Sequence, residues 1–191
     1  QFQQNVLKAT NESAVVVDNV AELDGLSPQQ ISSAAEAAKA RKLEGKWVIT
    51  LQNTTIQPVL AQLKNRALRE KIYRTSIARA NGGQYDNTAV VAKVVKLRAA
   101  KAALLGYPDY ASYSIEDGTA ATPANVNKML AGLVPAAIAN AKKEASYNEE
   151  LIQQQAKAAN GQSFTLEPWD WAFYAEQVKK AKFGFDEAQV K

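Results

Sequence analysis

Residues 58–80 read PVLAQLKNRALREKIYRTSIARA, and this stretch decides the fold class. Its apolar side chains recur every three to four residues, which is typical of one face of an α-helix. We therefore predict a helix over 58–80, ended by the Asn-Gly-Gly turn at 81–83.

A second helix is predicted over 87–105, capped by Asp86 or Asn87, and Gly106 would end it. Its apolar face would hold Val90, Val91, Val94, Leu97, Ala100 and Leu104. Two such helices would form an antiparallel helical hairpin.

Shorter elements are predicted on the N-terminal side of this hairpin. A short helix is expected over 2–9 and an extended segment over 14–18. Ser27, Pro28 and Gln30 form a capping box that should begin a further helix, and Gly45 is a candidate for its end.

A short strand or hairpin is predicted over 47–51, where β-branched and aromatic residues follow one another. A turn is expected at 53–55, where Asn-Thr-Thr follows the strand.

Further helices are predicted on the C-terminal side. A short aromatic helix over 108–115 would hold Tyr110 and Tyr113, and Thr122-Pro123 should open the longest helix, to about residue 159, with a bend at Pro135. A last helix would run to about Lys182, and Asp186 looks like the start of another. The predicted fold class is mainly α: an array of antiparallel helices, with one short strand or hairpin near 47–51, as a single segment 1–191.

Composition excludes several kinds of chemistry. The chain is 47% hydrophobic and 22% charged, and it contains neither Cys nor His. Disulfides, Cys-zinc sites and thiol catalysis are therefore excluded. Ser-His-Asp catalysis and histidine-ligated zinc are excluded for the same reason. No catalytic, cofactor-binding or metal-binding residue is predicted in this chain.

A basic stretch is the first candidate binding feature. Between Lys64 and Lys101, ten basic and two acidic side chains give a local formal charge of +8. A phosphate-binding face is one interpretation. A solvated hairpin, or one docked on an acidic surface, is the favoured one, because only Tyr73 interleaves with the charges. The basic residues are Lys64, Arg66, Arg69, Lys71, Arg74, Arg79, Lys93, Lys96, Arg98 and Lys101.

The acidic candidates are weaker. Glu149 and Glu150 are adjacent in a helix and point about 100° apart, so a solvated face explains them better than a shared proton or metal. Asp109, Glu116 and Asp117 lack the alternating ligand spacing of a calcium loop, and turn chemistry explains them better.

Trp169 and Trp171 flank Asp170 at a helix start. Asp170 is placed to cap that helix or to meet its positive end. The two large aromatic side chains are expected to anchor the helix by packing.

Several short motifs occur in order along nearly the whole chain. They are LDGLS at 23–27, WVITL at 47–51 through PVL at 58–60, NRALREK at 65–71, DN at 86–87, LR at 97–98, ALLGY at 103–107, DYA at 109–111 and LEPWDWAFYAE at 166–176. Together these motifs resemble the thimet oligopeptidase-like zinc peptidases, most closely the bacterial peptidyl-dipeptidase (dipeptidyl carboxypeptidase) branch. Asp117 to Ala120 depart from the family pattern before Thr122-Pro123, which is a local turn change.

The resemblance implies a large helical enzyme with a deep channel and zinc on its floor. The family's His-Glu-x-x-His motif is absent from this chain, so no catalytic residue is carried over. The implied role is a non-catalytic part of a peptidyl-dipeptidase that removes C-terminal dipeptides from short peptides. This chain would supply scaffold and channel wall, with the catalytic remainder of the polypeptide and short peptides as partners. Scaffold packing is expected from Trp47, Leu97, Leu105, Tyr110, Trp169, Trp171 and Tyr174.

Two alternatives stay open: a free-standing helical binding module, and a basic helical domain that binds nucleic acid. A fragment should expose apolar surface where its missing partner packs. The absence of an initiator Met and an end just after Asp186 suggest an excised piece. No membrane partner is expected, and the cytoplasm is the expected compartment, with the periplasm open.

Overall fold

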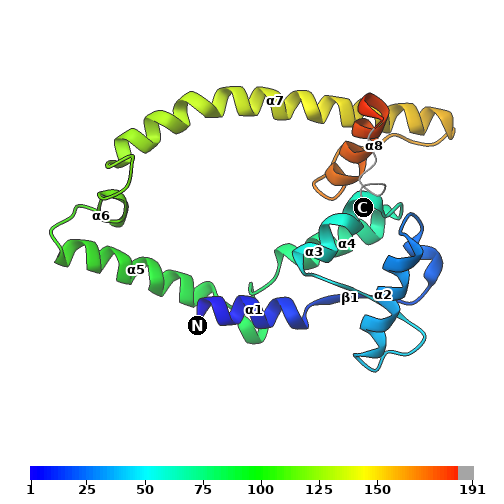
Figure 1. Cartoon of the computed structure of the whole chain (residues 1–191), viewed down its shortest axis with the longest axis horizontal. Helices are drawn as coiled ribbons and strands as arrows, with labels where there is room; N and C mark the ends of the chain where they lie inside the picture. Colours follow the sequence, from blue (N-terminus) through cyan, green and yellow to red (C-terminus); the bar gives the residue numbers. More distant parts are fainter. Residues whose placement is uncertain (185–191) are drawn as a thin grey trace. The chain divides into compact units, whose positions relative to one another are not determined.

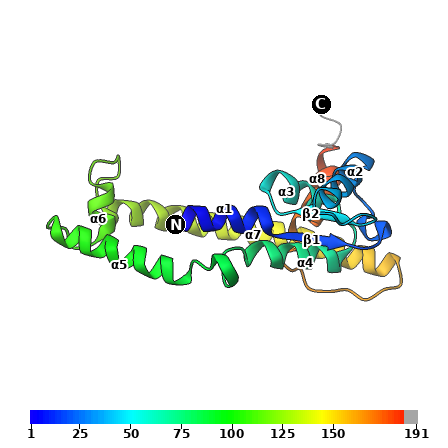
Figure 2. The same cartoon turned by 90° about the horizontal axis from the view of Figure 1, so that it is seen from below.

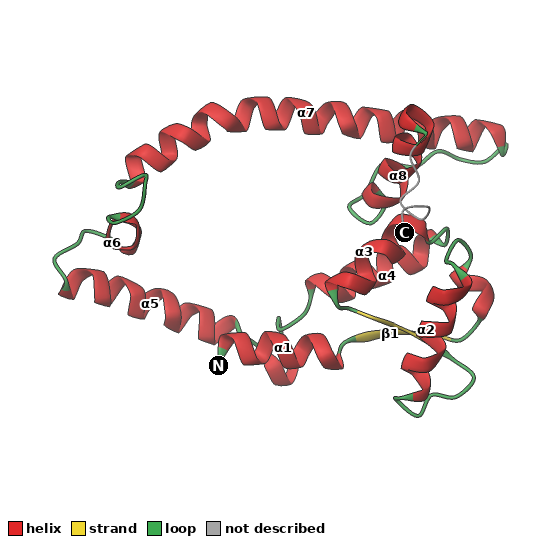
Figure 3. Ribbon diagram, viewed as in Figure 1, coloured by secondary structure: helices red, strands yellow, loops and turns green. Residues whose placement is uncertain are grey.

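The computed structural model describes residues 1–184, and these are mainly helical, as predicted (Figure 3). Helix α1 (Phe2–Glu12) begins the chain and is longer than the helix expected over 2–9. Strand β1 (Ala14–Val17) follows, and it pairs antiparallel with β2 (Trp47–Thr50) in a two-stranded sheet. Val16 lies opposite Val48 in the register. The predicted extended segments are therefore confirmed, and they form one sheet.

Helix α2 (Pro28–Lys39) begins with the predicted capping box. The Ser27 hydroxyl accepts a hydrogen bond from the Gln30 N–H, and the Gln30 side chain accepts one from the Ser27 N–H. A 3-10 helix, η1 (Val20–Leu23), precedes it. The expected end at Gly45 is wrong, because α2 ends at Lys39 and Gly45 lies in the turn before β2.

The single helix predicted over 58–80 is two helices, α3 (Asn53–Gln62) and α4 (Arg66–Ile77). Leu63 and Asn65 are extended between them, and the Asn65 side chain caps α4 by accepting from the Leu68 N–H. The turn expected at 53–55 is also wrong, because α3 begins there.

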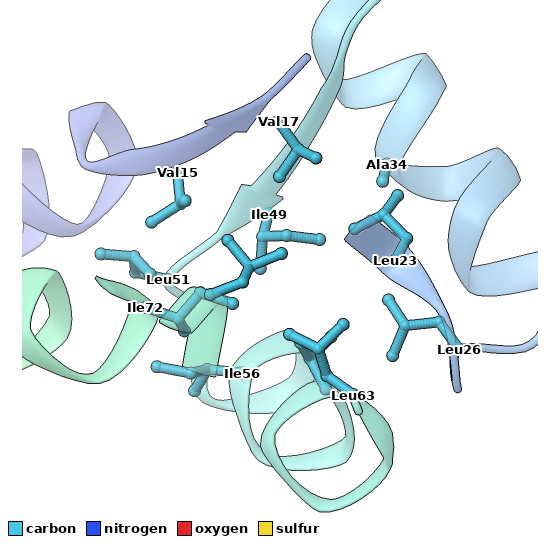
Figure 4. Close-up of a cluster of buried hydrophobic side chains, with 12 residues drawn as sticks. Val15, Val17, Leu23, Leu26, Ala34, Ile49, Leu51, Ile56, Leu63 and Ile72 are labelled. Atoms are coloured by element: carbon cyan, nitrogen blue, oxygen red, sulfur yellow. The ribbon is translucent and has the colours of Figure 1, made fainter. Parts of the chain in front are cut away.

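The core lies between the sheet, α2, α3 and α4, and its buried side chains point toward one another (Figure 4). Trp47 packs against it and is partly buried, as a core anchor should be. Val15 and Val17 face this core because alternate residues of a strand point to the same side. Its members are Val15, Val17, Leu23, Leu26, Ala34, Ile49, Leu51, Ile56, Val59, Leu63, Leu68 and Ile72.

The later helices are α5 (Thr88–Leu104), α6 (Tyr110–Ile115), α7 (Pro123–Ala158) and α8 (Trp171–Phe183), labelled in Figure 1. A 3-10 helix, η2 (Gly83–Tyr85), precedes α5. Gly106 ends α5 as predicted: its φ is 84°, its N–H donates to the Ala103 carbonyl, and the Tyr107 N–H donates to the Ala102 carbonyl. Asp86 accepts from the Thr88 N–H, whereas the Asn87 side chain caps nothing there. The bend expected at Pro135 stays a prediction, and the helix start expected at Asp186 lies outside the described residues.

The chain divides into two units. Unit 1 comprises Gln1–Asn5 and Ala80–Lys143, and unit 2 comprises Val6–Arg79 and the chain from Glu144 onward. Helices α4 and α5 belong to different units, so the predicted hairpin packing stays a prediction. Within unit 2, α8 packs against α3 (Figure 2). No helix of the described part is long and apolar enough to span a bilayer.

Candidate functional site

A buried carboxylate in unit 2 organises the strongest candidate site. Asp170 stands just before α8 and is fully buried. Arg69 of α4, also buried, donates to its Oδ1 through Nη2 at 2.8 Å. Arg66, at the start of α4, donates to its Oδ2 through Nη2, also at 2.8 Å. The expectation that Asp170 caps α8 is wrong, because its side chain makes no capping hydrogen bond there and instead binds these two arginines.

Arg69 also donates hydrogen bonds to three backbone carbonyls. Its Nη1 donates to the carbonyls of Leu63 and Lys64, at 2.9 and 3.0 Å, and its Nε donates to the Trp169 carbonyl at 3.2 Å. The guanidinium therefore satisfies the backbone at the break between α3 and α4 as well as the segment entering α8. Only the planar, multidentate donor set of arginine can make all these bonds at once.

Aromatic rings surround the two guanidinium groups. The Arg66 guanidinium lies 4.1 Å from the centroid of Phe164, and that of Arg69 lies 4.3 Å from Phe173. Arg74 lies 4.8 Å from the ring of Trp169. Stacking on aromatic faces is favourable for a partly desolvated arginine. Trp169 is buried as expected for a helix anchor, while Trp171 is half-buried.

The cluster of Asp170, Arg66 and Arg69, called the lock below, has a structural role, because its charged groups are hydrogen-bonded to one another. Both oxygens of Asp170 already accept hydrogen bonds, and Oδ2 takes an additional one from the Glu167 N–H at 3.3 Å. Hydrogen bonding to Asp170 raises the pKa of Arg66 above its ordinary value.

A cleft of about 600 Å³ adjoins the lock, between α3, α8 and the C-terminal part of α7. Phe173 contributes an apolar wall, while Lys64 and Glu176 contribute charge. The Gln155 side-chain amide donates through Nε2 to the Oε1 of Gln177 at 2.7 Å. The cleft can offer hydrogen bonds to a ligand, and its lining includes no hydroxyl, thiol or imidazole that could act as a nucleophile. Its amide side chains are Gln57, Gln62, Gln155 and Gln177.

The cations of the basic stretch make local contacts within each of the two units. Lys64 pairs with Asp24, Arg74 pairs with Glu70, and Arg79 donates to the Leu51 carbonyl. Lys71 reaches the Val16 carbonyl, and in unit 1 Arg98 and Lys101 lie over Tyr110 and Tyr113. Most of these cations therefore contact groups of the chain itself, and the stretch is divided between the two units.

The acidic candidates also have local roles. Asp109 caps α6 by accepting from the Ser112 N–H, which holds its pKa below the ordinary value. Glu116 accepts a hydrogen bond from the Tyr107 hydroxyl, and Glu149 and Glu150 are exposed. In the described part of the chain, no three His, Cys, Asp or Glu side chains come together as a metal site would require.

The predicted scaffold residues divide by unit. Tyr174 is buried and Trp169 joins the lock, in agreement with the prediction. The expectation for Leu97 and Leu105 is wrong within this chain, because these side chains are 58% and 49% exposed. Tyr110 is half-buried and stacks at 5.8 Å from Tyr113. The residues predicted to form the apolar face of α5 are therefore mostly exposed in this chain.

Sequence reasoning missed the lock itself. Arg66 and Arg69 were assigned to a solvated or docked basic face, and Asp170 to a helix cap. The hydrogen bonds that join Asp170 to these arginines span 104 and 101 residues of chain. No local pattern indicates such a pairing. The sequence indicates only that the chain holds an Arg-rich segment and an Asp flanked by aromatic residues. Both features are too common to predict that this Asp binds these arginines.

Comparison with known proteins identifies a family and several relatives. The model of the family described as Peptidase family M3 matches residues 59–191. The chain therefore belongs to peptidase family M3. Over its whole length it is 42% identical to the dipeptidyl carboxypeptidase of Escherichia coli (strain K12) and 33% identical to the oligopeptidase A of the same strain. It is 32% identical to the probable cytosolic oligopeptidase A of Arabidopsis thaliana. The chain spans 28% of the length of each of these relatives.

Proposed function

We propose that this chain is a structural part of a zinc-dependent peptidyl-dipeptidase, an enzyme that removes C-terminal dipeptides from short peptides. In this proposal residues 1–191 belong to the non-catalytic half, and they provide scaffold and channel wall. The observation that carries the proposal is the 42% identity to a dipeptidyl carboxypeptidase along the whole chain. Family membership supports it as well.

The donor set of this chain does not fit a catalytic zinc ion. Such a site takes His, Cys or carboxylate ligands, and the sequence has no His and no Cys. The carboxylates do not gather in threes within residues 1–184. Zinc and the groups that activate water would therefore come from the remaining catalytic part of the polypeptide. No step of peptide hydrolysis is assigned to these residues, and their partners are that remainder and short peptides.

The experiment is a dipeptide-release assay on the full-length protein encoded by the gene. The substrate is an N-acylated tetrapeptide with a free C-terminus, and the control is the same peptide with a C-terminal amide. We expect release of the C-terminal dipeptide from the free acid only, loss of activity with a chelator, and recovery with zinc. Equal internal cleavage of both peptides would contradict the dipeptidase assignment, and unchanged activity after chelation would contradict the metal.

A free-standing binding module is the second candidate, favoured by the amide-lined cleft between α3 and α8. In that case the 191-residue chain alone would bind short peptides, and Gln177→Leu would weaken the binding. Calorimetric titration with the same tetrapeptide measures this directly. A basic domain that binds nucleic acid is the less favoured candidate, because Lys64, Arg66, Arg69 and Arg74 already pair with carboxylates of the chain. We propose the cytoplasm as the compartment and no membrane partner, and cell fractionation tests both.

A further inference from the structure

The two units differ sharply in how much apolar surface they bury. Unit 2 contains the whole hydrophobic core cluster. Among the described side chains of unit 1, Ala102 is the one apolar residue that is buried. Helices draw most of their stability in proteins from packing an apolar face. Unit 1 therefore lacks the burial that would hold its long helices in place.

The uncovered side chains of unit 1 are large and lie on its two long helices. Helix α5 exposes Leu97 by 58% and Leu104 by 86%, and α7 exposes Met129 by 57% and Leu133 by 59%. Every residue from 127 to 143 of α7 is exposed. A helix that is apolar on most of its sides is normally buried, and a large exposed apolar surface marks an interaction site.

The charges on these helices have one sign. Helix α5 carries Lys93, Lys96, Arg98 and Lys101 and no acidic residue. Between Pro123 and Lys143, α7 carries Lys128, Lys142 and Lys143 and again no acidic residue. A surface that covers them would be apolar at its centre with carboxylates at its border, because complementary charge favours the correct partner and like charge opposes it.

We propose that the exposed faces of α5 and of the 123–143 part of α7 are docking surfaces for another part of the same polypeptide, apolar with an acidic border. This inference rests on the proposed function, under which these residues are part of a larger enzyme. In the dipeptidyl carboxypeptidase of E. coli, the matched region is 28% of the length, so most of that protein lies outside it. A large intramolecular surface is thus available to cover unit 1, whereas unit 2 contains the hydrophobic core cluster.

Amide hydrogen exchange tests this in the full-length protein and in the 191-residue chain, compared at the same pH and temperature. We expect the amides of α5 and of residues 123–143 to exchange at least about 100-fold faster in the 191-residue chain. The amides of β2 and α4, in the core of unit 2, should be protected equally in both. Equal protection of α5 and α7 in the two proteins would overturn the proposal.

Other occupants give other results. Protection of α5 that rises with the concentration of the 191-residue chain would identify a second copy as the occupant. Protection that appears only with anionic phospholipid vesicles would identify a lipid surface. Either result overturns the proposal. Because the readout is exchange and not activity, a full-length protein that releases dipeptides without protecting these helices would refute this inference alone.

Variants locate the surface within the full-length protein. Leu97→Asp and Leu133→Asp should each raise the exchange rate of their own helix by at least about 10-fold. Val20→Asp is the matched control, since Val20 is 45% exposed but lies in unit 2. It should leave exchange unchanged throughout. An equal effect of all three variants, or no effect of the first two, would contradict docking through unit 1.

Discussion

Among single residues of unit 2, Asp170 connects parts of the chain that are far apart in the sequence. It is fully buried, and it joins two arginines of α4 to the start of α8. A buried ion pair is not by itself a source of net stability, because desolvation opposes the attraction. The loss of one partner is a different matter, because it leaves a charged group buried without compensation.

Asp170→Asn should therefore destabilise unit 2 by about 3–5 kcal/mol, because Arg69 would stay buried without a counter-charge. Urea denaturation of the 191-residue chain followed by tryptophan fluorescence measures this, since Trp47, Trp169 and Trp171 all lie in unit 2. Asp24→Asn is the matched control: it breaks the Lys64–Asp24 pair, whose side chains are both 63% exposed, and should cost less than about 1 kcal/mol. Similar costs for the two variants would contradict the lock.

A second residue-scale prediction concerns pH. A hydrogen bond and the charge of Lys46, 2.7 Å away, lower the pKa of Asp18 below its ordinary value of 3.8. Because the folded pKa is lower than the unfolded one, the ionised pair stabilises the fold above pH 3.8, and this contribution is lost as pH falls through the folded pKa. NMR titration of the Asp18 carboxyl should give a value below 3.8 that returns toward 3.8 in Lys46→Gln or in high salt. A titration unchanged by Lys46→Gln would refute it.

At the scale of elements, sequence patterns predicted what depends on neighbours in the chain. The capping box at Ser27, the glycine at 106 and the paired extended segments all appear where local chemistry placed them. The break between α3 and α4 was missed because the apolar spacing continues through it. There the Lys64 N–H donates to the Asp24 carbonyl, and the Leu63 carbonyl accepts from Arg69. These tertiary hydrogen bonds replace helical ones. The helical spacing of apolar residues in the sequence does not indicate them.

The break itself can be tested through its cap. Asn65→Ala removes the acceptor for the Leu68 N–H and should destabilise unit 2 by about 1 kcal/mol. Asn65→Asp retains an acceptor oxygen and should stay close to the parent protein. Urea denaturation with tryptophan fluorescence distinguishes them. Equal losses in both variants would show that the cap does not hold the start of α4.

Two glycines provide a matched test of the approach between η1 and α3. Gly25 and Gly45 both have positive φ, 99° and 76°. A Cβ on Gly25 would stand 2.2 Å from the Gln62 carbonyl oxygen, whereas one on Gly45 would meet nothing within 4 Å. Gly45→Ala should cost about 1–2 kcal/mol from its backbone conformation alone. Gly25→Ala should cost clearly more, because the backbone at the end of α3 must move. Equal urea midpoints for the two variants would contradict this close approach.

Over the whole molecule, the two units differ in how much apolar surface they bury. Unit 2 has a packed core and a charged lock, while unit 1 presents apolar helices without a core of its own. From the sequence we predicted that a fragment would expose apolar surface, but not where. The sequence pattern of the apolar face of α5 is the same whether or not a partner covers that face. The exposed fractions in unit 1 locate that surface.

We propose that this chain supplies structure to a peptidase and none of its chemistry. The most direct test is the rate of dipeptide release from the free-acid tetrapeptide by the 191-residue chain in the presence of zinc, measured beside the full-length protein at equal concentration. We expect steady release by the full-length protein and no release above the buffer rate by the chain alone. Chelator-sensitive release by the purified 191-residue chain would contradict it, because its residues would then have to bind the metal and activate water without a histidine.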